Sequence, residues 1–251
     1  PASVENDHIV DGVQYNSYEE AMAAYWGWYA TGNHPTYNNH YGDGSPEGIE
    51  AAIRKYAQVI ADSVNKYDYD GFDIDYEPGY GHSGTLANYQ TISPSGNNKM
   101  QVFIETLSAR LRPAGRMLVM DGQPDLLSTE TSKLVDHYIY QAYWESSTSS
   151  VIYKINKPNL DDWERKTIIT VEFEQGWKTG GITYYTSVRP ELNSMEGNQI
   201  LDYATLDLPS GKRIGGIGTY HMEYDYPNDP PYKWLRKALY FGNQVYPGKF
   251  D

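Results

Sequence analysis

The chain has 251 residues, no cysteine and a formal net charge of −13. These values exclude disulfides and thiolate metal sites, and they argue against nucleic acid or anionic membrane surfaces as partners. No run approaches the roughly 20 apolar residues that an integral membrane helix needs.

The elements predicted from residue 45 onward alternate between helices and strands. Apolar residues from Ile49 to Val64 recur with the period of a helix, which Pro46 would begin and Ser45 would cap. A strand is expected at 70–77. Further along the chain we expect helices at 100–111, 125–134, 197–206 and 231–241, and strands at 117–121, 137–144, 166–174 and 214–220.

The spacing of the strands predicts the fold class. Five strands separated by segments long enough to hold helices favour parallel pairing, since antiparallel neighbours need only tight turns. The fold is therefore α/β, either a (β/α)8 TIM barrel or an open doubly wound sheet. No GxGxxG or GxxxxGK[ST] motif follows a strand, which argues against the nucleotide-binding forms of an open sheet. We expect a single domain, 1–251.

The stretch YDGFDIDYEPG at 69–79 carries the strongest functional pattern. Because side chains alternate along a strand, Asp73, Asp75 and Glu77 share one face, about 6.6 Å apart along the backbone. In a barrel this face is interior and ends at the C-terminal mouth, where barrels place their chemistry. Crowding of like charges in a low-dielectric interior raises the affinity of at least one carboxyl for a proton. We expect Glu77, the topmost acid, to serve as general acid.

Three other interpretations of this stretch compete with catalysis. A solvated acidic loop does not explain the strict alternation of acids with apolar residues. A calcium loop starting at Asp73 requires glycine at its sixth position and glutamate at its twelfth, where the chain has Pro78 and Gly84. A structural ladder of acids without catalysis stays open.

Three segments resemble glycoside hydrolase family 18, which includes chitinases and endo-β-N-acetylglucosaminidases. DGFDIDYE matches the DGxDxDxE signature of that family. YQAYW at 140–144 resembles the Gln-x-Tyr form of its sixth strand found in endo-β-N-acetylglucosaminidases, where chitinases more often show Met-x-Tyr-Asp. GGIGTYHMEYDY at 215–226 is similar to the last strand of bacterial endoglycosidases of this group. The resemblance covers about 45–251 and implies a (β/α)8 barrel.

The resemblance also implies retaining hydrolysis, in which the 2-acetamido carbonyl of the substrate attacks the anomeric carbon. Glu77 would protonate the leaving oxygen and then activate water. Asp75 would accept a hydrogen bond from the acetamido N–H, and Asp73 would share a proton or a hydrogen bond with Asp75. Tyr143 is the expected donor to the acetamido oxygen. Asp70 would point to the opposite side of the strand from these three acids, and we expect it to have a structural role.

Further candidates lie at the ends of the later strands. Each is weighed as a sugar contact against a supporting role in the fold: Gln141, Asp121, Gln123, Glu172, Tyr220 and Trp144. Many family members place a tryptophan after the last strand as the floor of the sugar site. This chain has none there, so Tyr220 or Tyr224 is a weaker candidate. The 6 histidines lack metal-ligand spacing, so neither a metal nor another cofactor is expected.

The N-terminal part is too short for three strands and their helices. If YDGFDIDYE is the fourth strand, only 68 residues precede it, and 45–66 already form the third helix. Residues 22–30 supply one strand. Either the chain forms an unusual incomplete barrel, or segments present in the molecule are missing from this sequence. We favour missing segments, with breaks between Trp26 and Asp43.

The leading hypothesis is an endo-β-N-acetylglucosaminidase that cuts between the two core N-acetylglucosamines of N-glycans. A chitinase acting on chitin-type oligosaccharides is the nearest alternative. A noncatalytic glycan-binding barrel is the other alternative, although such relatives usually lose the terminal glutamate and Glu77 is present. The start, PASVENDHIV, lacks the pattern of a signal peptide. A glycan substrate nevertheless implies a secreted, periplasmic or cell-surface bacterial protein.

Overall fold

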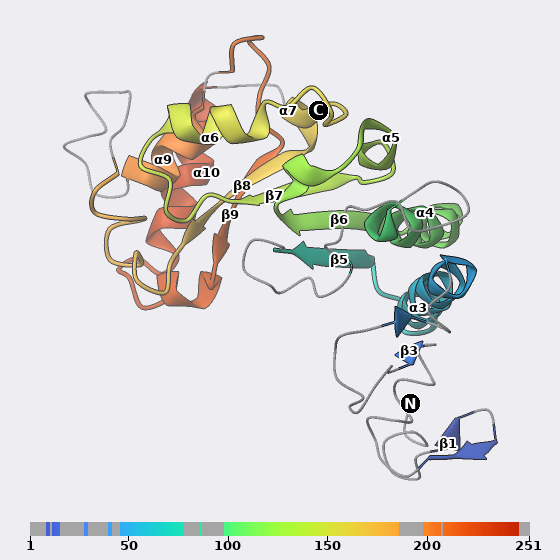
Figure 1. The fold of residues 1–251 in the computed structure, drawn as a ribbon. Coiled ribbons are helices and arrows are strands. Elements are labelled where there is room, and N and C mark those ends of the chain that lie inside the picture. The colour runs from blue at the N-terminus through green and yellow to red at the C-terminus, as the bar shows by residue number, and fades with distance from the viewer. Residues whose placement is uncertain are drawn as a thin grey trace. The chain divides into compact units, whose positions relative to one another are not determined.

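The structure, a computed structural model, describes residues 9–10, 12–15, 28–29, 40–41, 46–77, 86, 98–185, 198–206 and 208–245. The chain divides into two compact units, Pro1–Val119 and Met120–Asp251. The boundary falls inside strand β6 (Met117–Gly122), so each unit contains part of this strand. Figure 1 shows the elements in chain order.

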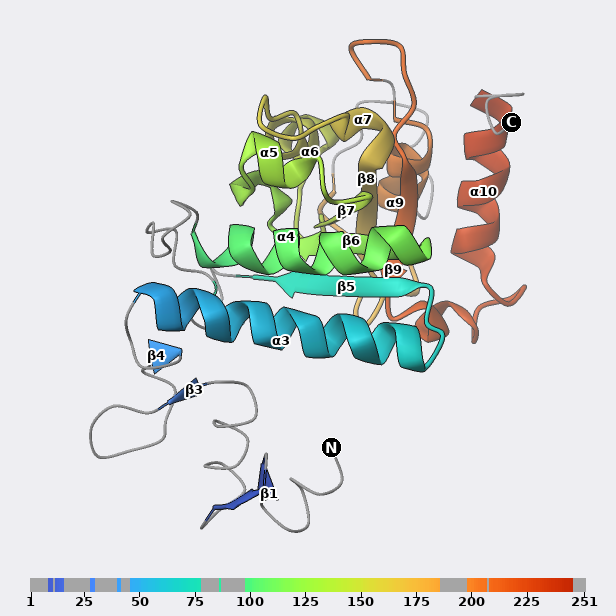
Figure 2. The same cartoon turned by 90° about the vertical axis from the view of Figure 1, so that its right-hand side faces the viewer.

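Unit 1 is built around two helices and one strand. Helix α3 spans Pro46–Lys66, strand β5 spans Gly71–Tyr76 and helix α4 spans Lys99–Leu111. The two helices run alongside β5 (Figure 2), and the rings of Tyr56 and Phe103 stack between them with centroids 5.4 Å apart. The positions of all three elements confirm the sequence prediction.

The start of α4 is fixed by a capping box. The side chain of Asn98 accepts a hydrogen bond from the N–H of Gln101, and the side chain of Gln101 accepts one from the N–H of Asn98, each at 2.9 Å. These bonds satisfy N–H groups that have no partner within the helix. A 3-10 turn at Arg112–Ala114 (η3) ends the helix. Ser45, the predicted cap of α3, lies outside the described residues.

Unit 2 contains the rest of β6 and three further strands, β7 (His137–Gln141), β8 (Thr167–Glu172) and β9 (Gly216–Tyr220). Strand β8 is parallel to both β7 and β9, as the long crossovers predict. The strands of the sheet follow the order of the chain, without the reversal that defines a doubly wound sheet. This confirms the α/β class, and the order is that of consecutive barrel strands.

The core of unit 2 lies on one face of these strands. Helices α6 (Thr148–Ile155), α9 (Asn198–Ala204) and α10 (Lys233–Val245) contribute to it (Figure 1). The buried side chains from the strands and from α10 include Tyr140, Ile169, Val171 and Trp234. The residues of opposite parity on β7, β8 and β9 therefore lie on the other face, where the candidate site is expected.

One expected helix differs from the prediction. The helix expected at 125–134 is a 3-10 turn, Pro124–Leu126 (η4), followed by the one-turn helix α5, Thr129–Ser132. The break arises because the Ser128 side chain accepts the N–H of Thr131 at 3.2 Å and starts a new helix there.

Helices α6 and α7 (Trp163–Lys166) were not predicted at all. Both are short, so their helical period is weak in the sequence. Across the described ranges, no helix is long and apolar enough to cross a membrane.

The N-terminal part of unit 1 is described only in short segments. Two antiparallel pairs occur, β1 (Ile9–Val10) with β2 (Val13–Gln14) and β3 (Trp28–Tyr29) with β4 (His40–Tyr41). The strand expected at 22–30 is described only at its β3 end, where the pairing is antiparallel rather than the parallel pairing of a barrel strand. Most of the region between Trp26 and Asp43, where missing segments were expected, lies outside the described residues.

Candidate active site

The acidic stretch forms strand β5 with the predicted alternation. Ile74 and Tyr76 are buried, Tyr76 completely, while Asp73 and Asp75 are exposed. Glu77 directly follows the last residue of the strand and is half-buried. The two strand acids therefore share the face that the apolar residues do not use, and Glu77 continues their series at the C-terminal end of β5.

Asp73 and Asp75 are only partly removed from solvent, rather than enclosed in the low-dielectric interior that was expected. Among the described strands, β5 stands at the edge of the sheet, so no described strand covers its other side. The predicted effect of crowding is nevertheless present at one carboxyl. Loss of solvent raises the pKa of Asp73 most, and the charge of Asp75 raises it further. A hydrogen bond from the backbone of Ile74 lowers it in part.

The register of unit 2 places three predicted residues on one face. Gln141, Thr170 and Gly218 are partners across β7, β8 and β9, and Glu172 is the partner of Tyr220. Partners in neighbouring strands point to the same side of a sheet. Gln141, Glu172 and Tyr220 thus share the face opposite the core, near the C-terminal ends of their strands.

Tyr143 and Trp144 do not lie on a strand, which corrects the predicted extent of 137–144. Strand β7 ends at Gln141, and the chain turns at Ala142. The ring of Tyr143 still lies beside that of Tyr220, with centroids 5.7 Å apart and planes tilted by 36°. The structure therefore brings Tyr143 to the same strand ends by a turn. Trp144, the next residue, is 52% exposed.

Glu172 has an unusual environment for an acid. It ends β8, which is shorter than the predicted 166–174, and it is only 4% exposed. One carboxyl oxygen, Oε1, accepts the N–H of Gln175 at 2.8 Å. The other, Oε2, is buried and has no hydrogen-bond partner among the described residues. A donor from a ligand would satisfy this oxygen, because a buried acceptor without a partner is costly.

Asp121 and Gln123 lie at the predicted C-terminal end of β6. Both are half-buried. The carboxylate of Asp121 accepts the N–H of Gly122 at 2.6 Å, where the chain turns with a φ of 96°. This bond fixes the start of the turn into η4.

Aromatic side chains cluster after β9. The ring of His221 lies 3.9 Å from that of Tyr220 and 5.7 Å from that of Tyr224. His221 has a positive φ of 33°, which is rare for a residue with a side chain. Its Nδ1 lies 2.9 Å from Oε1 of Glu223. Within the described ranges, no group of three histidine, aspartate or glutamate side chains is arranged to hold a metal ion.

Sequence reasoning missed the residues that support the turn after β7. Gln199 and Tyr203 lie on the buried side of α9, and both contact the backbone of that turn. Glu145, inside the turn, accepts a hydrogen bond from Tyr140 at 2.7 Å. The sequence signal for these contacts is weak: Gln199 stands one helical turn before Tyr203 on a helix face that is otherwise largely apolar.

Comparisons with known proteins agree with the acidic signature. The family described as glycoside hydrolase family 18, BT1044-like, matches residues 28–241. The solved structure of BT1044, a selenomethionine form with a glutamate-to-glutamine substitution, is 92% identical with a TM-score of 0.75, covering 81% of this chain and 63% of that chain. This chain thus spans less than two thirds of BT1044. A search of the curated proteins finds no match.

Two more distant solved structures are also similar. A proposed sporulation-specific glycosylase of Bacillus subtilis, ydhD, is 19% identical with a TM-score of 0.33, covering 48% of this chain and 43% of that chain. Catalytic domain 2 of a group II chitinase of Ostrinia furnacalis, in complex with penta-N-acetylchitooctaose, is 18% identical with a TM-score of 0.35, covering 49% and 39%.

The parallel strands define an α/β fold, and β5 carries the acidic signature of glycoside hydrolase family 18. With a family match over most of its length, the chain belongs to glycoside hydrolase family 18 and to the BT1044-like group within it.

Proposed function

We propose that the protein is a retaining endo-β-N-acetylglucosaminidase that hydrolyses the β-1,4 bond between the two core N-acetylglucosamines of N-glycans. The observation that carries this proposal is the arrangement of Asp73, Asp75 and Glu77 along β5. The terminal glutamate is present, which supports catalysis over binding alone. Membership of family 18 supports the substrate-assisted form of the reaction.

The three acids take separate roles in this reaction. Glu77 donates a proton to the leaving oxygen and then, as a carboxylate, activates the incoming water. Asp75 accepts a hydrogen bond from the acetamido N–H of the substrate, which orients the acetamido oxygen toward the anomeric carbon and stabilises the developing positive charge. Asp73, whose pKa is raised, shares a proton with Asp75 and lets that residue change partners through the cycle.

The strand ends of unit 2 supply the sugar contacts. The hydroxyl of Tyr143 donates to the acetamido oxygen, and Gln141 contacts the same sugar. Glu172 offers its buried Oε2 to a sugar hydroxyl. Exposed rings of Tyr220 and Trp144 face solvent and suit the C–H faces of further sugars.

Asp121 and Gln123 add polar contacts from the end of β6. The Gln-x-Tyr pattern of Gln141 and Tyr143 is what favours N-glycans over chitin, because chitinases of the family more often have Met-x-Tyr-Asp at this strand. A substrate on glycoproteins places the protein outside the cytoplasm, as a secreted, periplasmic or cell-surface protein.

The test compares the protein with its Glu77→Gln variant on a mixture of N-glycosylated proteins, with the products read by mass spectrometry. We expect single N-acetylglucosamine stubs on asparagine with the wild type only. Chitin oligomers are digested in parallel. Cleavage of those oligomers with intact glycoproteins would show a chitinase, and binding of glycans without cleavage of either substrate would show a lectin.

A further inference from the structure

We infer that Gln199 is a positioning residue that holds the turn after β7, residues 142–145, and with it the side chains of Tyr143 and Trp144. The inference concerns how this turn is fixed. Its consequence for catalysis rests on the proposed function, in which Tyr143 contacts the substrate.

The contacts of Gln199 point at the backbone of the turn. Gln199 is completely buried on α9. Its side-chain nitrogen, Nε2, donates to the hydroxyl oxygen of Tyr203 at 3.2 Å and lies 3.4 to 3.5 Å from the carbonyl oxygens of Ala142, Tyr143 and Glu145. One amide group thus faces three carbonyls of a single turn. Since the strand has ended, these carbonyls have no neighbouring strand to bond, and the helix side chain takes its place.

The same side chain ties the turn to the segment after β8. Its oxygen, Oε1, accepts the N–H of Ile182 at 2.8 Å. Gly181 leaves the room for this contact, because a Cβ at that position would collide with the Gln199 side chain, and its φ of 143° suits glycine. Gln199 therefore links two segments that follow neighbouring strands, each carrying candidate residues at its strand end.

Other buried groups hold the turn from further directions. The hydroxyl of Tyr203, one helical turn after Gln199, donates to the carbonyl of Ala142 at 3.1 Å. The Glu145 side chain accepts hydrogen bonds from Tyr140 and Ser150 and pairs with Lys154 at 2.6 Å. Burial raises the pKa of Tyr140 and its bond to Glu145 raises it further, so its hydroxyl remains a donor.

Only an amide side chain meets both demands at position 199. It must donate to carbonyls on one side and accept from an N–H on the other, and glutamine does both with its two ends. An ionised glutamate cannot donate, and methionine fills the volume without either bond. Loss of the amide removes the acceptor of the Ile182 N–H and the contacts to three carbonyls of the turn, which frees the turn to move. A hydroxyl that contacts a transition state must be held to within roughly 0.5 Å.

The test uses the whole protein and the variants Gln199→Met and Tyr203→Phe. The first readout is hydrogen exchange in the absence of substrate, at the N–H groups of Ala142 and Glu145, which donate to the carbonyls of Tyr140 and Ala142. We expect exchange at both amides to be at least tenfold faster in Gln199→Met and accelerated to a lesser degree in Tyr203→Phe. Unchanged exchange in Gln199→Met overturns the inference, whatever the activity of the protein.

The second readout is kinetic and uses a matched control. The Tyr185 hydroxyl donates to Asp202 at 2.9 Å rather than to the turn, so Tyr185→Phe removes a comparable buried bond while keeping its ring against Tyr203. We expect Gln199→Met to lower kcat at least tenfold with a smaller change in KM, and Tyr185→Phe to leave kcat near that of the wild type.

A double-mutant cycle with Tyr143→Phe separates positioning from general loss of stability. If Gln199 acts through Tyr143, Gln199→Met should cost far less activity in the Tyr143→Phe background than in the wild type. Additive losses overturn the inference. A wild type that cleaves no glycan overturns the proposed function instead, and the exchange measurement still decides whether Gln199 fixes the turn.

Discussion

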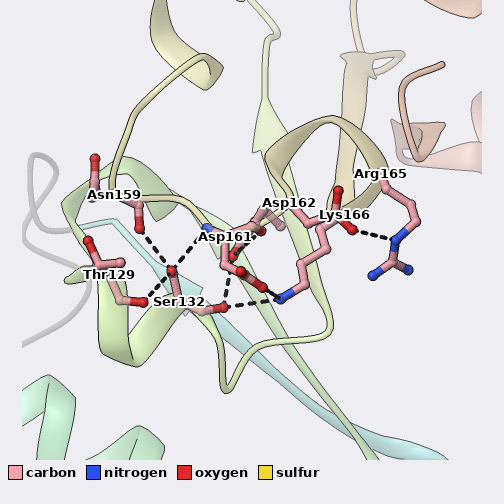
Figure 3. Close-up of polar contacts among 8 residues, drawn as sticks. Thr129, Ser132, Asn159, Asp161, Asp162, Arg165 and Lys166 are labelled. Atoms are coloured by element: carbon pink, nitrogen blue, oxygen red, sulfur yellow. Dashed lines mark hydrogen bonds and ion pairs between the residues drawn. The ribbon is translucent and has the colours of Figure 1, made fainter. Parts of the chain in front are cut away.

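Buried polar groups gather at both ends of the β7–β8 pair, and the two ends differ in what those groups hold. Before the strands, Ser132, Asp161 and Lys166 form one cluster (Figure 3). Lys166 is 6% exposed and its Nζ lies 2.8 Å from a carboxylate oxygen of Asp161. The Tyr138 hydroxyl, whose pKa burial raises to about 12, donates to the carbonyl of Ser132 at 2.8 Å.

Beyond the strands, the groups on α9 bond the turn that carries Tyr143 and Trp144. The bonds at both ends are of the same kind, from buried side chains to backbone carbonyls. At the starts of the strands they join loops that carry no candidate site residue, and at the C-terminal ends they position side chains that do. In a barrel, the first end serves stability and the second serves chemistry. This contrast predicts that activity and stability respond to different substitutions.

The largest expected effect is on activity, at the C-terminal end of β5. Asp75→Asn should lower kcat by about 10²- to 10⁴-fold, because the amide cannot carry the charge that stabilises the reacting acetamido group. Its free energy of unfolding should stay close to that of the wild type, since Asp75 is exposed. The measurements are kcat on a defined N-glycopeptide and unfolding in urea.

Asp70→Asn is the matched control, because Asp70 is also exposed but precedes β5. We expect kcat in this variant to remain near the wild-type value. Equal losses of kcat in the two variants would show that net charge, rather than the position of the acid at the strand end, determines activity.

The sequence sufficed for the parts of the site that depend on local patterns. The strict alternation in DGFDIDYE predicts both the strand and the shared face of Asp73 and Asp75, because strand parity is a local property. Parity also places Glu172 and Tyr220 on one face, and the register of β8 and β9 agrees. The burial of Glu172 is not local, since it depends on the chain that follows β8.

The end of β7 shows where local patterns fail. HYIYQAYW is rich in strand-forming residues throughout, so the sequence predicts a strand to 144, yet β7 stops at Gln141. The Tyr143 carbonyl instead faces the side chain of Gln199, 56 residues later in the chain. No pattern near Tyr143 encodes a contact at that separation, and tertiary contacts override strand propensity at such positions.

The second prediction concerns stability, at the starts of the strands. Ser132 is completely buried, its hydroxyl lies 2.8 Å from the carbonyl oxygens of Thr129 and Asn159, and it accepts the N–H of Asp161 at 3.0 Å. Ser132→Ala leaves buried groups without a partner and should lower the free energy of unfolding by about 1–3 kcal/mol. At temperatures where the variant is folded, its kcat should be unchanged.

Ser149→Ala, at an exposed position of α6, is the control and should change neither quantity. A large fall in kcat for folded Ser132→Ala would remove the distinction between the two ends, because the cluster before the strands would then also support the chemistry.

The smallest expected effect tests whether the acids of β5 lower stability. The folded-state pKa of Asp73 is raised above its ordinary value of 3.8, chiefly by loss of solvent and then by the charge of Asp75. The folded protein therefore binds this proton more tightly than the unfolded chain, and the free energy of unfolding falls as pH rises from the unfolded to the folded pKa. Asp73→Asn does not titrate and lacks this fall. Urea unfolding should show the variant to be more stable than the wild type near neutral pH, with the difference shrinking in acid below the ordinary pKa.

Asp70→Asn controls for net charge and should show no such gain. If Asp73→Asn is instead less stable at neutral pH, the carboxylate of Asp73 contributes to folding there, and the C-terminal end of β5 serves stability as well as chemistry.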